Sequence, residues 1–453
     1  MSALARYLNT NNSNISGSDR ENSSLIEELI KEGIKNIWVP HNRKNIEKIN
    51  PDLIVYSTAV TPDNAELIWA KENKKEIIHR SDLLDALTSS KKLISVSGTH
   101  GKTTTSAMIT HVLIKNNLNP QAIIGGIFLD KNTNIITGSG DYFVIEADES
   151  DKSFLKGNPE IAVITNIEPD HLENFPGGFE EIKDSFLEFA KKPLSRKGLV
   201  VCFDDKTTRE IITKNFDIKN ENIFSYGINE KYKPKITAKY NATKNSWDIS
   251  VKGNFSTSVK LTTPGRHNVL NALAAFSTGY LLGISPEKIK DSIESYPGVK
   301  RRFQILTSSN KITIIDDYAH HPTEIAAVIS SARELNPKRI VAVLQPHQPG
   351  RLKDLWNEFI EVLKNQDFNI FITDTYIARG SEIEGINSKK LVQEINKQNI
   401  TYLPGNIDDI AGQLEKVIKE GDLVLIMGAG DITNLGPKLL KACGRLVLSS
   451  GNN

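Results

Sequence analysis

The chain has 453 residues, too many for one ordinary hydrophobic core, and this length predicts roughly two to four domains. Its formal net charge is +1, from 56 Lys and Arg residues against 55 Asp and Glu residues, so no overall positive field favours nucleic acid or an anionic membrane surface. The apolar runs are far shorter than the roughly 20 residues that span a bilayer, and no secretory signal opens the chain. We therefore expect a cytoplasmic protein without membrane insertion.

Short β-branched runs alternate with helical patterns along the whole chain, which predicts α/β domains with parallel sheets covered by helices. Nearly every run is followed at once by polar or glycine residues. Ligands bind at the carboxyl ends of strands in such sheets, so the chemistry is expected in these following residues. The predicted strands are Leu53–Tyr56, Leu93–Val96, Tyr142–Ile145, Ile161–Ile164, Ile312–Ile315, Ile340–Leu344 and Leu423–Ile426.

Two polar segments, residues 88–92 and the turn at residues 295–298, predict domain boundaries. Between about residues 226 and 260 the pattern changes to short alternating polar stretches, which predicts an antiparallel appendage. The two cysteines, Cys202 and Cys443, lie outside any metal-ligand spacing, and we expect both to be packing residues. The predicted domains are residues 1–89, 90–297 and 298–453.

A glycine-rich loop follows the predicted strand that ends at Val96, and a helical pattern follows the loop. Glycines let backbone N–H groups close around phosphate oxygens, and the helix N-terminus adds partial positive charge. Lys102 is placed to reach the outer phosphates of ATP, and the Thr103 hydroxyl to ligate Mg²⁺. The alternative, a turn that only caps a buried helix, leaves these side chains unexplained. The predicted ATP-binding residues of the loop are Gly98, Thr99, His100, Gly101, Lys102, Thr103 and Thr104.

The loop departs from the general G-x-x-x-x-G-K-[ST] pattern, because Val96 stands where that pattern has its first glycine. This shortened form resembles the loop shared by Mur ligases, folylpolyglutamate synthetases and cyanophycin synthetases. The resemblance to Mur ligases runs from residue 1 to near residue 435. Four further motifs occur in the order found in that family: Glu146–Asp151, Asn166–His171, Pro264–Asn271 and Asp316–Glu324.

The resemblance implies three domains: a Rossmann-like N-terminal domain that binds a UDP-sugar, a central P-loop-type ATPase domain, and a Rossmann-like C-terminal domain for amino acid and nucleotide. Within the family, the motifs are closest to the ligases that join L-alanine to UDP-N-acetylmuramate. The implied reaction consumes ATP with Mg²⁺ and passes through an acyl phosphate in peptidoglycan precursor synthesis. Catalysis of such a reaction consists of positioning and charge neutralisation.

Glu146 directly follows one predicted strand, and His171 follows the next by a few residues. Both are expected at the carboxyl edge beside the phosphate loop. A cluster of four acids at residues 146–151 is by itself typical of a solvated loop, and the neighbouring phosphate loop favours a functional role. His171 is also a candidate proton acceptor. The resemblance implies Thr103, Glu146 and His171 as metal ligands and Glu149 and Ser150 as substrate contacts.

Further residues of the nucleotide site follow from the resemblance alone. Helix capping after Pro264 and Gly265 is a compatible alternative for the asparagines among them. Lys102 also belongs to the implied catalytic set, with His171 and Arg351. The implied residues of the adenine, ribose and phosphate contacts are His267, Asn268, Asn271, Arg302 and Asp317.

Two loops that follow strands of the third domain are expected to converge on the incoming amino acid. Arg351 is suited to clamp a carboxylate with two hydrogen bonds. The chain departs from the family at Gln348, where the alanine ligases usually have a second basic residue. Identity of the amino acid is therefore less well defined than the type of reaction. The implied contacts are Tyr318, His320, His347 and Arg351, and the turn at residues 428–431 is expected to be structural.

Two alternatives remain open. The first is a recycling ligase that adds a preformed tripeptide to the same sugar nucleotide, although its motif usually carries an aromatic residue where Ser150 stands. The second is a scaffold that binds ATP without turnover.

In the family, a parallel strand and a glycine-rich turn precede a helix that begins like Met1–Leu8. We therefore expect the native chain to start upstream. A separate expectation concerns the phosphate loop: Lys102 should be an exposed loop residue whose replacement leaves the fold intact.

Overall fold

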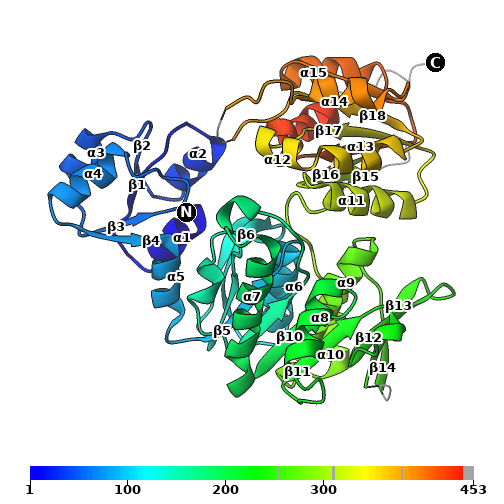
Figure 1. The fold of residues 1–453 in the computed structure, drawn as a ribbon, viewed down its shortest axis with the longest axis horizontal. Helices are drawn as coiled ribbons and strands as arrows, with labels where there is room; N and C mark the ends of the chain where they lie inside the picture. Colours follow the sequence, from blue (N-terminus) through cyan, green and yellow to red (C-terminus); the bar gives the residue numbers. More distant parts are fainter. Residues whose placement is uncertain (253–254, 309–311, 379–380, 442–453) are drawn as a thin grey trace. The chain divides into compact units, whose positions relative to one another are not determined.

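The structure, a computed structural model, describes residues 1–252, 255–308, 312–378 and 381–441 (Figure 1). The chain divides into two compact units. The first comprises Met1–Leu261 and Leu270–Pro297, and the second comprises Thr262–Val269 and the described residues from Gly298 onward. Each unit contains parallel strands with helices packed against them, so the α/β class predicted from the sequence is confirmed.

The first 90 residues form two separate sheets, each of two parallel strands. The predicted strand Leu53–Tyr56 is present. The expectation of a further strand upstream of Met1 is not tested by the described residues and stays a prediction. The strands are β1 (Ser16–Ser18), β2 (Asn36–Trp38), β3 (Leu53–Tyr56) and β4 (Glu76–His79), and the helices are α1 (Ser2–Thr10), α2 (Ser24–Lys31), α3 (Arg43–Ile49), α4 (Ala65–Glu72) and α5 (Arg80–Thr88).

Helix α1 packs against the large sheet that follows it in sequence. Leu4 and Tyr7 are buried in one cluster with Leu93 and Phe143 of that sheet. Arg6 is only 4% exposed, and its guanidinium forms an ion pair with Glu32, with Nε and Oε2 2.6 Å apart. The first helix therefore shares a core with the central sheet, and the two parts lie in one compact unit.

The central sheet has ten strands in the order β14-β13-β12-β11-β10-β9-β5-β8-β6-β7. Its middle strands run parallel, and their side chains are buried on both faces because helices cover the sheet. The strands are β5 (Lys92–Ser97), β6 (Gln121–Phe128), β7 (Thr133–Thr137), β8 (Tyr142–Glu146), β9 (Ile161–Ile164), β10 (Gly198–Cys202) and β11 (Ile223–Gly227), and the helices are α6 (Lys102–Lys115), α7 (Gly178–Lys191), α8 (Lys206–Asn215), α9 (Arg266–Leu281) and α10 (Pro286–Glu294).

The predicted antiparallel appendage is confirmed at one end of this sheet. Strand β12 (Ile236–Asn241) pairs antiparallel with β13 (Ser246–Val251), which pairs antiparallel with β14 (Phe255–Val259). Cys202 at the end of β10 is 1% exposed, and burial raises the pKa of its thiol to about 12, so it is a packing residue as predicted. Cys443 lies outside the described residues.

A buried histidine on α6 gives the first unit a pH-sensitive contact. The Nε2 of His111 lies 3.3 Å from the Ser295 hydroxyl, and its ring meets the Tyr296 ring edge-on with 5.8 Å between centroids. Burial lowers the pKa of His111 to about 4. The folded protein therefore holds this imidazole neutral at pH 7.

We expect the variant His111→Phe to lose less stability than the wild type when the pH is lowered. The pKa of His111 is lower in the folded chain than the usual 6.5, so the unfolded chain binds more protons between pH 6.5 and pH 4. Stability that is present above pH 6.5 is lost as the pH falls through this window. Between pH 7 and pH 4.5, the free energy of unfolding of the wild type should fall by on the order of 1–3 kcal/mol more than that of the variant. Denaturant unfolding of the two proteins at both pH values measures this difference. Equal declines would contradict the assignment.

The second unit is built on a six-stranded sheet with the order β15-β16-β20-β17-β18-β19. The edge strand β15 is antiparallel and the other five strands are parallel. The strands are β15 (Gln304–Ser308), β16 (Ile312–Asp317), β17 (Arg339–Leu344), β18 (Asn369–Ile372), β19 (Ile400–Tyr402) and β20 (Asp422–Met427), and the helices are α11 (Pro322–Glu334), α12 (Pro349–Asp354), α13 (Trp356–Lys364), α14 (Ser388–Ile395) and α15 (Ile407–Glu415).

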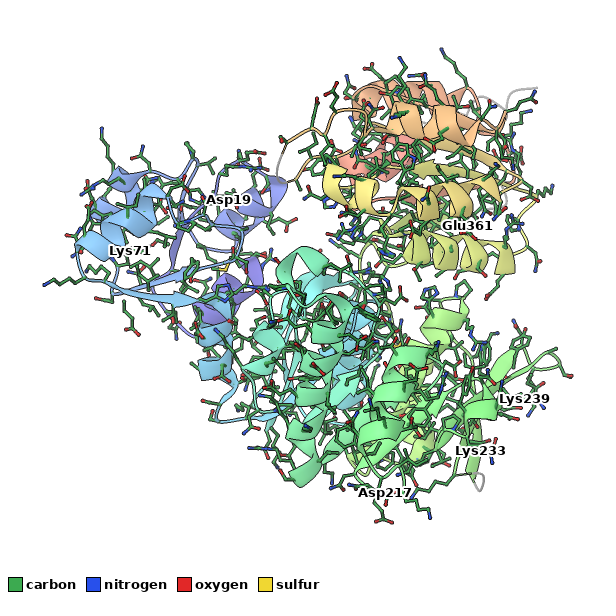
Figure 2. The ribbon with its side chains drawn as sticks, in the orientation of Figure 1. Asp19, Lys71, Asp217, Lys233, Lys239 and Glu361 are labelled. Carbon is green, nitrogen blue, oxygen red and sulfur yellow. The ribbon has the colours of Figure 1, made fainter. Side chains whose placement is uncertain are left out.

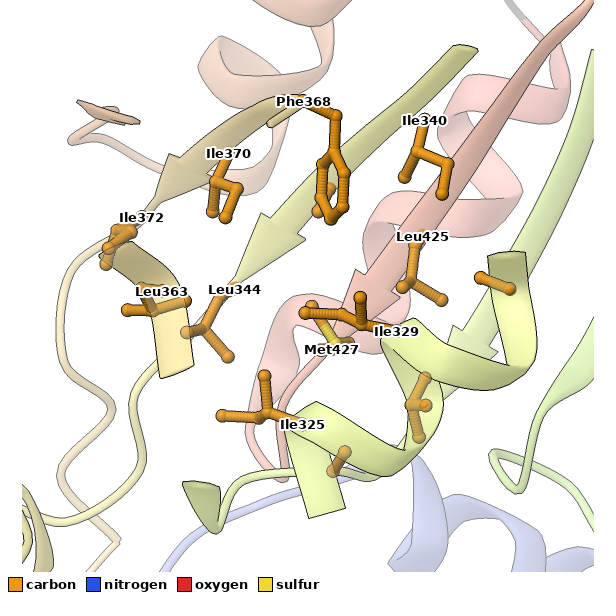
Figure 3. Packing of buried hydrophobic residues seen from close by; sticks show 14 of the residues in the cluster. Ile325, Ile329, Ile340, Leu344, Leu363, Phe368, Ile370, Ile372, Leu425 and Met427 are labelled. Atoms are coloured by element: carbon orange, nitrogen blue, oxygen red, sulfur yellow. The ribbon is translucent and has the colours of Figure 1, made fainter. Parts of the chain in front are cut away.

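Figure 3 shows how helix α11 covers this sheet. Ile325 and Ile329 on the helix pack with Leu344 of β17 and with Leu425 and Met427 of β20, and all five are at most 2% exposed. Burying a side chain of this kind stabilises a fold by about 1.5–3 kcal/mol. The strand ends that carry the candidate amino-acid site therefore rest on a rigid core.

Charged side chains are exposed on the surfaces of both units. Figure 2 shows Lys71, Asp217 and Glu361 among the side chains that project outward from the ribbon. Among the helices described, none combines the length and the apolar character that crossing a membrane requires.

Candidate active site

The phosphate loop lies between β5 and α6, where the sequence predicts it. Gly98 and Gly101 have φ angles of 134° and 83°, a region that residues with a side chain rarely adopt. A Cβ atom on Gly98 would lie 2.1 Å from Thr165 Oγ1, and one on Gly101 would lie 2.6 Å from Asn271 Oδ1. Both positions therefore require glycine for conformation and for space.

The segment that follows β9 fastens this loop through Asn166. The His100 N–H donates to Asn166 Oδ1 at 2.8 Å, and Asn166 Nδ2 donates to the His100 carbonyl at 2.9 Å. The Thr99 N–H donates to the Asn166 carbonyl at 3.1 Å. The sequence did not reveal this role of Asn166. The signals in the sequence were the position of Asn166 just beyond a predicted strand and its place at the start of the Asn166–His171 motif.

Lys102 is shielded, so the prediction of an exposed loop lysine is wrong. Its side chain is 20% exposed, and its Nζ donates to the Gly98 carbonyl at 2.6 Å and lies 2.7 Å from Glu149 Oε1. Glu149 is only 6% exposed, because the acidic segment after β8 lies over the loop. Desolvation opposes the charge on Lys102, but the carboxylates of Glu149, Asp148 and Glu146 together outweigh it and raise the pKa of Lys102.

Glu146 and Thr103 bring together the oxygen ligands that Mg²⁺ prefers. The Thr103 hydroxyl donates to Glu146 Oε2 at 3.0 Å, and the Gly125 N–H of β6 donates to Glu146 Oε1 at 2.5 Å. The carboxylate is thus held at the end of β8, directly beside the first turn of α6. A carboxylate and a hydroxyl next to a phosphate loop fit Mg²⁺, which usually keeps several waters and takes further ligands from nucleotide phosphates.

The remaining acids of the cluster have their own partners, so the solvated-loop interpretation does not hold for them. Asp148 pairs with Arg80 at 2.6 Å and accepts hydrogen bonds from the Ser150 N–H and hydroxyl at 3.1 and 2.7 Å. Asp151 accepts a hydrogen bond from the Thr58 hydroxyl at 2.9 Å. The predicted contact of Ser150 with substrate stays a prediction, and its hydroxyl here fixes Asp148.

His171 has a φ of 55°, and its Nε2 lies 3.5 Å from Oδ2 of Asp170. Its predicted roles as a metal ligand and proton acceptor stay predictions. In the first unit, Asn271 accepts a hydrogen bond from the Thr105 hydroxyl at 3.1 Å and lies against Gly101. This predicted nucleotide contact therefore lies beside the phosphate loop.

The other predicted nucleotide contacts belong to the second unit. Burial lowers the pKa of His267 to about 4, and Asn268 Nδ2 donates to the Pro264 carbonyl at 2.8 Å. Arg302 lies over the Tyr318 ring at 5.0 Å. Asp317 accepts the N–H groups of Phe303 and Ala319 at 2.6 and 2.7 Å, and burial raises its pKa to about 6. Their contacts with nucleotide stay predictions.

The predicted amino-acid contacts come together at the carboxyl ends of β16 and β17. The ring of His320 meets the rings of Tyr318 and His347 edge-on, with 5.3 and 5.4 Å between centroids. Burial lowers the pKa of His320 to about 4, with a smaller contribution from the charge of Arg351. Two imidazoles, a phenol and a nearby guanidinium therefore share one small region.

A fifth residue, Tyr376, extends this group and was not predicted. It follows β18, and its ring stacks on that of His347 with 5.8 Å between centroids and 10° between planes. The predicted structural turn after β20 closes against it, since a Cβ on Gly430 would lie 2.5 Å from Tyr376 Cγ. A lone tyrosine beyond a short strand gives no signal in the sequence.

Two cavities lie at the ends of strands, and of these two the first is lined by predicted site residues. One of about 330 Å³ in the first unit is lined by Lys102, Gly125, Glu146 and Asp148, together with Arg80 and the start of α1. The other, of about 570 Å³, lies at the carboxyl ends of the strands in the second unit. Its described lining includes Gln345, Asp374 and Asp431 and none of the predicted amino-acid contacts.

Comparisons with known proteins give one consistent result. The catalytic-domain model of the Mur ligase family matches residues 1–92, the Mur ligase middle-domain model matches residues 96–279, and the Mur ligase glutamate ligase domain model matches residues 301–430. A UDP-N-acetylmuramate–L-alanine ligase from Clostridium tetani is 40% identical over 447 residues, covering 97% of this chain and 95% of that protein. One from Caldanaerobacter subterraneus is also 40% identical, with the same two coverages.

Solved structures with a similar fold are also Mur-type ligases. The crystal structure of UDP-N-acetylmuramate-alanine ligase from Thermotoga maritima superimposes with a TM-score of 0.81 at 28% identity, covering 98% of this chain and 96% of that one. A murein peptide ligase from Psychrobacter arcticus shares the fold, with a TM-score of 0.70 at 22% identity. With three successive domain models matched and relatives aligned over nearly its whole length, the chain belongs to the Mur ligase family.

Proposed function

We propose that this ligase joins L-alanine to the lactyl carboxylate of UDP-N-acetylmuramate and consumes ATP. The observation that carries the proposal is the hydrogen-bonded group of Lys102, Thr103, Glu146 and Glu149 at the phosphate loop. Such a group suits phosphoryl transfer to a carboxylate, and the relatives named above carry this activity in their names. Residues 1–89 would bind the UDP-sugar, 90–297 ATP, and 298–453 the amino acid.

An amide forms from a carboxylate only when one carboxylate oxygen becomes a leaving group. In the proposed reaction the γ-phosphoryl group of ATP moves to that oxygen, which gives an acyl phosphate and ADP. The neutral amine then attacks the carbonyl carbon, and the tetrahedral oxyanion collapses to the amide with release of phosphate. Lys102 neutralises charge on the outer phosphates and the oxyanion. His171 is the proposed acceptor of the proton that the amine loses.

Thr103 and Glu146 are the proposed magnesium ligands, with His171 at a second position. When bound, Mg²⁺ supplies positive charge to the phosphate oxygens and the developing oxyanion. The chain's own contribution is to hold Glu146 between the Thr103 hydroxyl and the Gly125 N–H, so that the carboxylate does not need to reorient. ATP and nucleotide sugars are cytoplasmic metabolites, so we place the reaction in the cytoplasm.

The amino acid is proposed to bind among Tyr318, His320, His347 and Arg351. Arg351 would hold its carboxylate, and the three rings would enclose its small side chain. A tripeptide-recycling activity is disfavoured by Ser150, whose hydroxyl holds Asp148 at 2.7 Å, a contact that an aromatic side chain lacking this hydroxyl could not make.

We expect phosphate release to require Mg-ATP, UDP-N-acetylmuramate and an amino acid together, and to be fastest with L-alanine. A panel of the common amino acids plus the tripeptide L-alanyl-D-glutamyl-meso-diaminopimelate, scored by phosphate release, measures this preference. Fastest turnover with the tripeptide would identify a recycling ligase. No release with any acceptor would indicate an ATP-binding scaffold and overturn the proposal.

A further inference from the structure

The loop after β18 is joined to the loop after β17 by backbone hydrogen bonds. The Tyr376 N–H donates to the Pro346 carbonyl at 2.8 Å, and the Gln348 N–H donates to the Tyr376 carbonyl at 2.8 Å. His347 and Tyr376 thus form a parallel bridge beyond the ends of their strands. This pairing places the two rings side by side on the same face.

The same hydrogen bonds hold an unusual backbone conformation next to His347. Gln348 has φ 69° and ψ 119°, in a region that L residues seldom occupy. Such a conformation persists only where the surroundings fix it, and strained residues cluster at ligand sites. The carbonyl of Tyr376 accepts the N–H of this residue, so the Tyr376 loop is part of what fixes it.

The Tyr376 ring is confined on two sides. The His347 imidazole stacks on it, and the Gly430 backbone approaches so closely that a Cβ there would lie 2.5 Å from Tyr376 Cγ. The edge of His347 in turn meets His320, with 5.4 Å between ring centroids. Because the tyrosine cannot retreat past Gly430, it fixes how far His347 stands from His320.

We propose that Tyr376 is a positioning residue of the amino-acid site, which holds the His347 imidazole at the spacing that admits a small side chain. The proposal rests on the proposed function for the role of this site and for the identity of the amino acid. Tyr376 acts through His347, so its effect should appear in the use of the amino acid and not in the use of ATP or the UDP-sugar.

The test compares Tyr376→Ala with Tyr376→Phe, which keeps the stacked ring. With the amino acid that the wild-type enzyme uses best, the alanine variant should raise KM for that amino acid roughly tenfold, as expected when a packed ring pair is lost. KM for ATP and for the UDP-sugar should stay within about twofold, and the phenylalanine variant should resemble wild type. The kcat/KM for larger amino acids should rise relative to that for the amino acid that the wild type uses best.

A matched control is Tyr240→Ala, which removes a ring paired with Trp247 at 5.3 Å in the appendage of the first unit. It should change none of the three KM values. If Tyr376→Ala is too unstable to assay, Tyr376→Leu removes the stacked ring but keeps apolar volume, and it should give the same selective rise. An unchanged KM for the amino acid, or an equal rise in all three KM values, would overturn the proposal.

A readout without turnover separates this inference from the proposed function. In protein labelled at histidine, the imidazole signals of His347 should shift and broaden in Tyr376→Ala, and those of His171 in the other unit should not. His347→Gln assigns the signal. If the wild-type enzyme ligates no amino acid, the proposed function fails, and the His347 signals still decide whether Tyr376 positions the His347 imidazole. Unaltered signals in the variant would refute the positioning role.

Discussion

Replacing Lys102 with alanine is expected to lower the rate of ligation by roughly a hundredfold or more, the size of effect seen when a group that stabilises transition-state charge is removed. Lys102 is the first residue of α6, and its ammonium group donates to the Gly98 and Thr99 carbonyls, so it lies directly beside the backbone of the phosphate loop. Phosphate release at saturating substrates measures the effect. Turnover near that of the wild type would refute the assignment of this loop to the phosphates.

The control for this variant must account for Glu149. Removing one partner of a buried ion pair typically destabilises a protein by about 3–5 kcal/mol, unless the remaining carboxyl group takes up a proton. The double variant Lys102→Ala, Glu149→Gln removes both charges and should melt close to wild type while remaining slow. Recovery of turnover in the double variant would mean that the single change acts through the stranded carboxylate and not through the phosphates.

Replacing Glu146 with glutamine is expected to raise the Mg²⁺ concentration for half-maximal activity by roughly tenfold or more. The amide keeps the volume and can preserve both contacts, because its oxygen can accept from the Gly125 N–H and its NH₂ group can donate to the Thr103 hydroxyl. The loss of negative charge is then the main change. A magnesium titration of initial rates measures it, and the melting temperature should stay near that of wild type.

Asp148→Asn is the matched control for Glu146→Gln. Asp148 belongs to the same acidic segment and pairs with Arg80 at 2.6 Å, so its charge already has a partner. Its replacement should leave the magnesium titration nearly unchanged. A larger shift in the Asp148 variant than in the Glu146 variant would move the metal ligand to Asp148.

Sequence patterns predicted seven of the strands in the two units and missed others, among them β10 and β18. All seven predicted strands are present, and their ends differ from the observed ones by no more than two residues. The reason is physical: a strand buried on both faces must be apolar along its whole length, and polar residues or glycine must follow where it meets solvent. For example, Ile161–Ile164 is fully buried in β9, and the segment that supports the phosphate loop begins immediately after it.

Sequence patterns could not predict which side chains meet across distant loops. Glu149 and Lys102 are 47 residues apart, and only the folded arrangement of β5 and β8 buries their pair. Tyr376 lies one strand beyond His347 in the chain and reaches it because β17 and β18 are neighbours. Local composition describes such residues as loop residues, and their contacts depend on strand order, which composition does not specify.

If ATP binds at this loop as proposed, the ion pair between Lys102 and Glu149 makes nucleotide binding an exchange of partners. For a phosphate to pair with Lys102 in place of Glu149, the lysine would separate from a carboxylate that is 6% exposed and whose second oxygen has no hydrogen-bond partner among the described residues. The free energy of that separation is included in any measured affinity for ATP, which is therefore weaker than the intrinsic attraction between lysine and phosphate. A cation that arrives with the nucleotide offsets the carboxylate left behind, so the two ligands are thermodynamically linked through one side chain.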